Sequence, residues 1–233
     1  MDRTRARQIA SGVAFLAVCA IAVLIVLTQV GGGAGGDTNL EDVGLVEQQL
    51  HGIPQHGTVL GDPKAKVKVI EYGDLQCPIC KGFSESVAPD LIDQLVRRGT
   101  ASYDFRQWPV IGDAPHVAST LAAKAALAAS EQGRYWNYVE LFYRNQGTEE
   151  SGYVTDPFMT AIAKGAGVAN VPRWNRDRSS AKWNPVLARI NAEAQRLDFS
   201  GTPSFEIVGP GGEQSLVGPQ SLDAIQSAIQ AVE

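Results

Sequence analysis

The chain has 233 residues, of which 44% are hydrophobic, and it carries a formal net charge of −5. This hydrophobic fraction excludes disorder over the whole length, and the composition also excludes a collagen-like chain. Three cysteines are too few for a disulfide scaffold, and the mild acidity argues against a general nucleic-acid-binding protein.

The N-terminal region contains a long apolar segment. Residues 9–30 include no charged side chain, and as a helix they would span about 33 Å, enough to cross a bilayer core of ~30 Å. Three arginines lie within residues 1–8, and no Lys or Arg follows the segment until Lys64. The positive-inside rule therefore predicts cytoplasmic residues 1–8, a single transmembrane anchor over residues 9–30, and a catalytic domain outside the cytoplasm.

A cleaved signal peptide is the alternative interpretation of this segment. The apolar region of a signal peptide is usually about 7–15 residues long, which is shorter than residues 9–30. However, residues 32–34 are small and offer a cleavage site. Cys19 lies inside the apolar run and is interpreted as a buried residue of the span.

Residues 31–57 are predicted to form a flexible linker, because a glycine-rich stretch is followed by a polar, acidic one. The spacing of apolar residues within it is compatible with a short helix over residues 40–50. The remaining segment, residues 58–233, is large enough for one compact core.

The first part of that segment predicts a strand, a helix and a second strand. The β-branched run KVKVIEY is bounded by turn residues and indicates a strand. Apolar residues at helical spacing follow from Phe83 to Val96 and end before Gly99. Tyr103 and Phe105 mark the second strand. This order favours a parallel βαβ unit.

A helical block then occupies residues 113–198, and strands return after it. The predicted helices cover residues 117–130, 135–145, 156–164 and 186–197, the third being capped by Asp156. Strands at residues 204–208 and 214–217 are joined by a predicted four-residue turn. A last helix places Leu222, Ile225, Ile229 and Val232 on one face.

The motif Cys77-Pro78-Ile79-Cys80 lies where the first strand of this segment meets its helix. A thiol at a helix N-terminus meets unpaired N–H groups, which stabilise its thiolate. We therefore expect Cys77 to be an exposed, reactive thiol and Cys80, one turn further, to be more buried. Pro78 suits the first helical turn, because it has no N–H group to leave unpaired.

Other functions of this cysteine pair are less well supported. A structural zinc site needs four ligands, and the histidines, His51, His56 and His116, do not have metal-ligand spacing. Two free structural thiols outside the cytoplasm would tend to oxidise. The pattern favours a redox role.

Two motifs resemble the DsbA-like thiol–disulfide oxidoreductases of the thioredoxin superfamily: VIEYGDLQCPIC at residues 69–80 and GTPSF at residues 201–205. The resemblance covers residues 58–233. It implies an α/β fold in which residues 58–112 and 199–233 form a thioredoxin-like core and residues 113–198 a helical insertion, preceded by the single N-terminal transmembrane helix.

The resemblance also implies roles for particular residues. Cys77 matches the nucleophilic cysteine and Cys80 the resolving one. Pro203 matches the cis-proline beside the disulfide, and the backbone of Thr202 is then a substrate contact. Glu71 matches a buried acid that relays protons to Cys80; the alternative is an exposed glutamate on an edge strand.

Pro78 and Ile79, which lie between the cysteines, are further predicted substrate contacts. Ile79 stands where the best-known relatives have a histidine, and it offers neither a hydrogen bond nor a positive charge to the thiolate. The disulfide should therefore be less oxidising than theirs. Thr202 replaces a valine of those relatives, which leaves the direction of electron transfer open.

These observations predict a monomeric, single-pass membrane oxidoreductase that introduces disulfides into secreted or membrane proteins outside the bacterial cytoplasm. The resemblance implies thiol-containing, unfolded substrate proteins and reoxidation by a DsbB or VKOR-like membrane oxidase. It implies no cofactor, metal or nucleic acid. The alternatives are a disulfide reductase or isomerase with the same site, and a non-catalytic tethered chaperone.

Overall fold

The computed structural model describes residues 39–114 and 116–233. The predicted anchor over residues 9–30 and the first part of the predicted linker lie outside these residues. Within the described ranges, no helix is long and apolar enough to cross a membrane.

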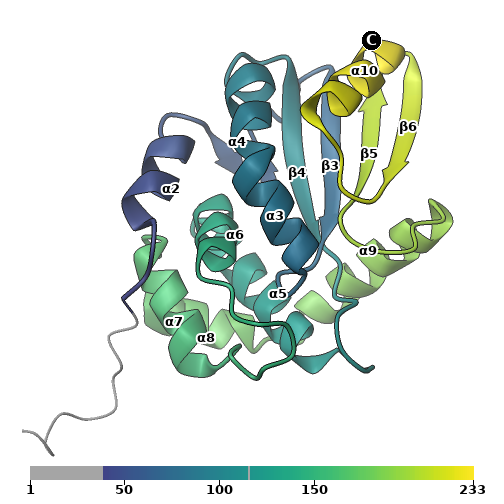
Figure 1. Cartoon of the computed structure of the whole chain (residues 1–233). Coiled ribbons are helices and arrows are strands. Elements are labelled where there is room, and N and C mark those ends of the chain that lie inside the picture. Colours follow the sequence, from purple (N-terminus) through teal and green to yellow (C-terminus); the bar gives the residue numbers. More distant parts are fainter. Residues whose placement is uncertain (1–38, 115) are drawn as a thin grey trace, which may run out of the picture. The chain divides into compact units, whose positions relative to one another are not determined.

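A six-stranded sheet with the order β1-β2-β4-β3-β5-β6 forms the centre of the fold (Figure 1). Its strands are β1 (Gln55–His56), β2 (Val59–Leu60), β3 (Val67–Gly73), β4 (Ala101–Gln107), β5 (Ser204–Gly209) and β6 (Gly212–Val217). Strands β3 and β4 are parallel, and the other pairs are antiparallel. The predicted βαβ unit is therefore confirmed, and β5 returns from the end of the chain to pair with β3.

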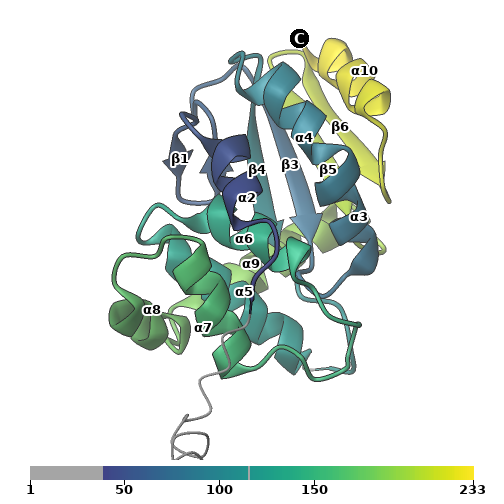
Figure 2. The same cartoon turned by 60° about the vertical axis from the view of Figure 1, so that its left-hand side comes forward.

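Helices cover both faces of the sheet (Figure 2). On one face lie α3 (Pro78–Ser86), α4 (Ala88–Leu91) and α10 (Leu222–Val232), and the opposite face is covered by α9 (Trp183–Arg196). Because side chains alternate along a strand, β3 contributes to two cores. Val69 lies in the main core with Phe83 of α3, whereas Tyr72 packs with Ala194 of α9 in a smaller second core.

The predicted helix from Phe83 to Val96 is not continuous. It divides into α3, α4 and a turn of π-helix over Ile92–Val96, with the break at Val87. Pro89 explains the break, because its ring removes an N–H donor and clashes with the preceding turn of a continuous helix.

In the described residues between β4 and β5, five helices form the helical insertion, which confirms this part of the predicted fold. They are α5 (Val117–Ser130), α6 (Tyr135–Arg144), α7 (Asp156–Gly165), α8 (Val171–Arg178) and α9. The indole of Trp174 in α8 donates to the Ala125 carbonyl of α5 at 2.8 Å. The cap of α7 is Thr155, which accepts from the Phe158 amide, and not Asp156 as predicted.

The predicted linker over residues 31–57 is wrong for its described part. The short helix expected over residues 40–50 is confirmed as α2 (Val43–Leu50), but Val46 and Leu50 are buried in the main core, so this helix belongs to the folded domain. Strand β1 follows and pairs with β2, which in turn pairs with β4. Strands of two residues leave no readable alternation in the sequence, so only the tertiary contacts reveal them.

The C-terminal hairpin turn is shorter than the four residues predicted, because Gly209 pairs with Gly212 and only Pro210 and Gly211 connect the strands. Gly209 also has a packing role: a Cβ atom there would lie 2.4 Å from the Val232 carbonyl oxygen. This close approach lets the end of α10 rest against the hairpin.

Candidate active site

Cys77 and Cys80 lie at the carboxyl end of β3, where the chain enters α3. Cys77 is the N-cap residue of that helix, and its Sγ accepts a hydrogen bond from the Cys80 amide at 3.4 Å. Pro78 occupies the first turn, as predicted. Both cysteines are free thiols in this structure, which therefore represents the reduced state.

The two thiols differ in burial less than expected. Cys80 is completely buried, but Cys77 is only 3% exposed, so the prediction of an exposed Cys77 was wrong. The backbone of Thr202 covers it: the Cys77 thiol donates to the Thr202 carbonyl oxygen at 3.5 Å. Ile79, between the cysteines, is 51% exposed and lies at the surface.

The local hydrogen bonds separate the acidities of the two thiols. A hydrogen bond from the Cys80 thiol, with smaller contributions from Thr202 and the amides of Cys80 and Ile79, lowers the pKa of Cys77 to about 6, although burial acts in the opposite direction. Burial raises the pKa of Cys80 well above its usual range, and the hydrogen bond to Cys77 and the charge of Glu71 add to this. Cys77 is therefore the thiolate of the pair at neutral pH.

Thr202 and Pro203 reach the cysteines through strand pairing. Ser204, the first residue of β5, pairs with Tyr72 near the end of β3. The Thr202–Pro203 peptide bond, just before β5, is cis, and Pro203 is buried. The two sequence motifs, although far apart in the chain, thus meet at one end of the sheet.

Asp74, Tyr143 and Gln146, which the sequence did not single out, hold the cysteine loop in place. The buried carboxylate of Asp74 accepts from the amides of Gln76, Val110 and Ile111. The Gln146 side chain donates to the carbonyls of Leu75 and Cys77, and Tyr143 donates to the Asp74 carbonyl. Tyr143 and Gln146 belong to the helical insertion, so the insertion shapes the site.

Glu71 lies on the central strand β3 and is only 2% exposed, which excludes the alternative of an exposed glutamate on an edge strand. The Tyr103 hydroxyl of β4 donates to its carboxyl group. Burial raises the pKa of Glu71 to about 8, and the Tyr103 hydrogen bond opposes that rise. Glu71 therefore holds a proton at neutral pH.

A second buried carboxyl group, Glu140 of α6, was missed by the sequence analysis. It is 1% exposed and accepts a hydrogen bond from the Ser84 hydroxyl of α3 at 3.0 Å. Burial raises its pKa to about 7. The sequence did carry a signal: Glu140 is the one acidic residue of the segment YWNYVELFY at residues 135–143, which is otherwise mostly aromatic and aliphatic. In the structure all nine of these residues are buried.

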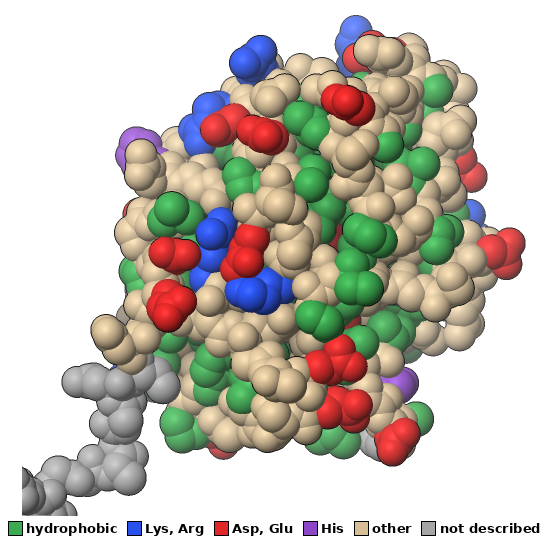
Figure 3. Space-filling view, viewed as in Figure 1, with side chains coloured by type: hydrophobic (Ala, Val, Ile, Leu, Met, Phe, Trp, Pro, Cys, Tyr) green, Lys and Arg blue, Asp and Glu red, His purple; other side chains and the backbone are tan. Residues whose placement is uncertain are grey.

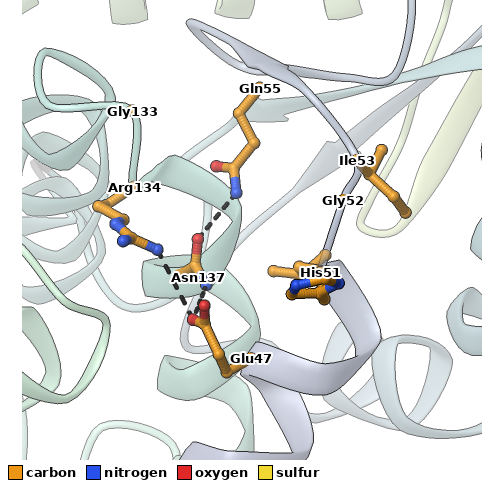
Figure 4. Close-up of a pocket in the computed structure, with 9 residues that line it drawn as sticks. Glu47, His51, Gly52, Ile53, Gln55, Gly133, Arg134 and Asn137 are labelled. Atoms are coloured by element: carbon orange, nitrogen blue, oxygen red, sulfur yellow. Dashed lines mark hydrogen bonds and ion pairs between the residues drawn. The ribbon is translucent and has the colours of Figure 1, made fainter.

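A separate cavity of about 240 Å³ lies where α2 packs on α6 and contains none of the predicted site residues (Figure 4). Its polar groups bind one another: the Asn137 amide accepts from Gln55 and donates to Glu47. We therefore interpret this cavity as a gap between two packed helices and not as a candidate active site. No group of three or more potential metal ligands occurs within the described ranges.

The thioredoxin family model matches residues 55–231. A Bacillus cereus protein described as a probable disulfide bond formation protein D is 27% identical over 171 residues, which cover 73% of this chain and 76% of that protein. The range matched by the family model includes both motifs and the helical insertion.

Two solved structures have the same fold. BdbD from Bacillus subtilis, in its oxidised form, aligns with a TM-score of 0.65 at 21% identity, covering 77% of this chain and 95% of that one. A thioredoxin-like oxidoreductase from Silicibacter pomeroyi aligns with a TM-score of 0.60 at 28% identity, covering 82% and 95%. The chain therefore belongs to the thioredoxin family and is a DsbA-like thiol–disulfide oxidoreductase.

Proposed function

We propose that this oxidoreductase introduces disulfides into secreted or membrane proteins outside the cytoplasm, with Cys77 and Cys80 as its redox pair. The observation that supports this direction of transfer most strongly is the low pKa of Cys77, about 6. A thiolate that is stable in the reduced enzyme makes the disulfide easier to reduce, and hence a better oxidant of substrate thiols.

The reaction begins with the Cys77–Cys80 disulfide. A substrate thiolate attacks Cys77 Sγ, the bond between the two cysteine sulfurs breaks, and Cys80 leaves with the electron pair. A second substrate thiolate then attacks the substrate sulfur of the mixed disulfide and releases Cys77 as a thiolate. The substrate gains one disulfide, and the enzyme is left with two reduced cysteines.

Glu71 supplies the proton that the leaving Cys80 requires. Because Cys80 is fully buried, its thiolate is unfavourable and takes up a proton. Glu71, protonated at neutral pH and buried beside the same helix, is suited to donate it. The charge of Glu71 raises the pKa of Cys80, so the two groups influence one another.

The substrate polypeptide binds beside the cysteines. Thr202 is partly exposed next to the cis-proline, and Ile79, two residues after Cys77, is exposed. Figure 3 shows hydrophobic side chains along the face beside α3, next to the segment that joins β6 to α10. Such a surface suits the apolar segments of an unfolded protein. Pro78, Ile79 and Thr202 are our proposed contacts.

The proposed anchor over residues 9–30 holds the domain near the membrane, where a DsbB or VKOR-like oxidase regenerates the disulfide. Because α2 is part of the folded domain, only residues 31–42 remain between the anchor and Val43. These 12 residues reach at most about 40 Å when fully extended, which keeps the cysteines close to a membrane partner.

The test compares two reactions of the full-length protein in detergent: oxidation of reduced ribonuclease and rescue of scrambled ribonuclease. An oxidase performs the first faster than the second, whereas the opposite order indicates an isomerase. Trapping thiols in cells checks the same point, because an oxidase is found mainly as the disulfide. If C77A acted on ribonuclease as well as the wild type in these two reactions, the protein would be a binding module and the proposal would fail.

A further inference from the structure

Glu140 is connected to the proposed proton donor by side chains of the same buried cluster. The ring of Trp136, one turn earlier on α6, packs on the ring of Tyr103 with centroids 4.6 Å apart. Tyr103 donates to Glu71. On the other side, Glu140 accepts from Ser84, which lies one turn after Cys80 on α3. Glu140 therefore contacts the cysteine helix directly, and its own helix contacts Tyr103, the hydrogen-bond partner of Glu71.

Within the described residues, no cation neutralises these two carboxyl groups. Neither Glu71 nor Glu140 forms an ion pair with any residue in that part of the chain. The nearest basic group on α6, Arg144, pairs with Asp42 at 3.6 Å, although it still lowers the pKa of Glu140. Two buried carboxyl groups without a cation cannot both ionise cheaply.

The other titratable groups around the pair come from all the packed elements. They are Tyr103 on β4, Tyr143 on α6, and Cys77, Cys80 and Glu85 near or on α3. Glu85 is already paired with Lys81. The tyrosines stay neutral because burial raises their pKa values well above the usual range. Among the described residues, the basic groups at this cluster are Arg144 and Lys81, whose ammonium group pairs with Glu85 and donates to the Tyr143 carbonyl oxygen at 2.7 Å; neither forms an ion pair with Glu71 or Glu140.

We propose that Glu140 is a positioning residue for thiol–disulfide exchange, whose negative charge keeps the reacting proton on Glu71 until Cys80 leaves. This inference rests on the proposed function, since it assigns Glu71 the role of proton donor. The charge of Glu140 acts through the buried cluster and not through contact with either sulfur.

The proton balance of the step follows from this arrangement. When the substrate thiolate breaks the disulfide, Cys80 leaves with the electron pair and takes the proton of Glu71. Glu71 and Glu140 are then both ionised within one buried cluster, so the pair takes up one proton from solvent. Reduction of the disulfide is thereby linked to proton uptake by the glutamates.

A purely structural role for Glu140 makes a different prediction. If its carboxyl group served only to join α6 to α3 through Ser84, then glutamine would replace it, because a side-chain amide oxygen also accepts from a hydroxyl. The variant E140Q retains this hydrogen bond and removes the charge. It therefore distinguishes the two roles.

The experiment is a pH titration of the side-chain carboxyl carbons by NMR, on the reduced full-length protein in detergent. In E140Q, the midpoint of Glu71 should fall by about half a pH unit or more, a roughly threefold loss of proton affinity. In E71Q, the midpoint of Glu140 should change little, because Glu71 is still protonated over the pH range in which Glu140 ionises. E213Q, which changes an exposed carboxylate on β6, should leave both midpoints unchanged.

A Glu71 midpoint that is the same in E140Q and in the wild type overturns the proposal. If E140Q does not fold, the titration of Glu71 in E140M, which removes the same charge with a side chain of similar length, decides the question. The oxidation of reduced ribonuclease is measured in parallel, and in E140Q its decline with rising pH should begin at a lower pH. A wild-type protein without oxidase activity would refute the proposed function but leave the measured coupling between the glutamates intact.

Discussion

The Cys77 thiol lies 3.5 Å from the carbonyl oxygen of Thr202, a residue 125 positions later in the chain. The contact exists because β5 pairs with β3 and the loop before β5 lies beside the start of α3. The helical insertion therefore leaves the two motifs adjacent. The first motif contributes the two cysteines, and the second contributes the backbone that covers Cys77.

Cys77 should react with iodoacetamide as a thiolate whose formation has a midpoint near pH 6, because hydrogen bonding lowers its pKa to about 6. In C80A the midpoint should move up toward the usual value, since the Cys80 thiol is the largest contribution to that shift. C80S, which keeps a hydroxyl donor, should fall between the two. A wild-type midpoint near pH 9 would show that the site does not stabilise the thiolate.

The sequence was sufficient to predict this pair, because the residues that create its chemistry are local. A strand rich in β-branched residues, a proline in the first helical turn and the spacing of the cysteines all lie within residues 67–80. The burial of Cys77 was not predictable in the same way, because Thr202 covers it from a distant part of the chain.

Replacing Ile79 by histidine should make the disulfide more oxidising. Ile79 is half exposed, so a histidine fits there and can place a donor near the Cys77 thiolate. A charge-assisted hydrogen bond of ~1.5–3 kcal/mol corresponds to a rise of roughly 30–60 mV in reduction potential. I79L serves as the apolar control and should keep the wild-type potential. Equal potentials for I79H and I79L would contradict this explanation.

Glu71 should make the stability of the reduced protein depend on pH. Its pKa is about 8 in the folded state, against 4.5 for an unperturbed glutamate, so the folded state binds the proton more tightly. The stability linked to this proton is complete below pH 4.5 and is lost as the pH rises through 8. Urea unfolding between pH 4.5 and 8 should show a smaller decline in E71Q than in the wild type. Parallel curves would mean that Glu71 is not protonated in the folded protein.

Helix α2 should contribute to the stability of the domain, contrary to what a flexible linker would do. Leu50 is 4% exposed and belongs to the main core, so L50A should lower the free energy of unfolding by ~2–5 kcal/mol. L45A changes a residue of the same helix that is 47% exposed, and it should alter stability by less than about 0.5 kcal/mol. Equal effects of the two substitutions would restore the linker interpretation.

The errors of prediction share one cause. The packing of α2 on α6, the pairing of the two-residue strands β1 and β2 with β4, and the burial of Glu140 on α6 all depend on contacts between segments far apart in the sequence. The cap of α7 shows the same limit at short range. Thr155 and Asp156 are both good capping residues, and only the backbone geometry decides between them.

The reduction potential of the Cys77–Cys80 pair, measured for the full-length protein in glutathione buffers, tests the central claim most directly. An enzyme that introduces disulfides must be a stronger oxidant than thioredoxin, whose potential is about −270 mV. We predict a value clearly above this, since the Cys77 thiolate is stabilised in the reduced state. A value at or below about −270 mV would contradict the account and indicate a reductase.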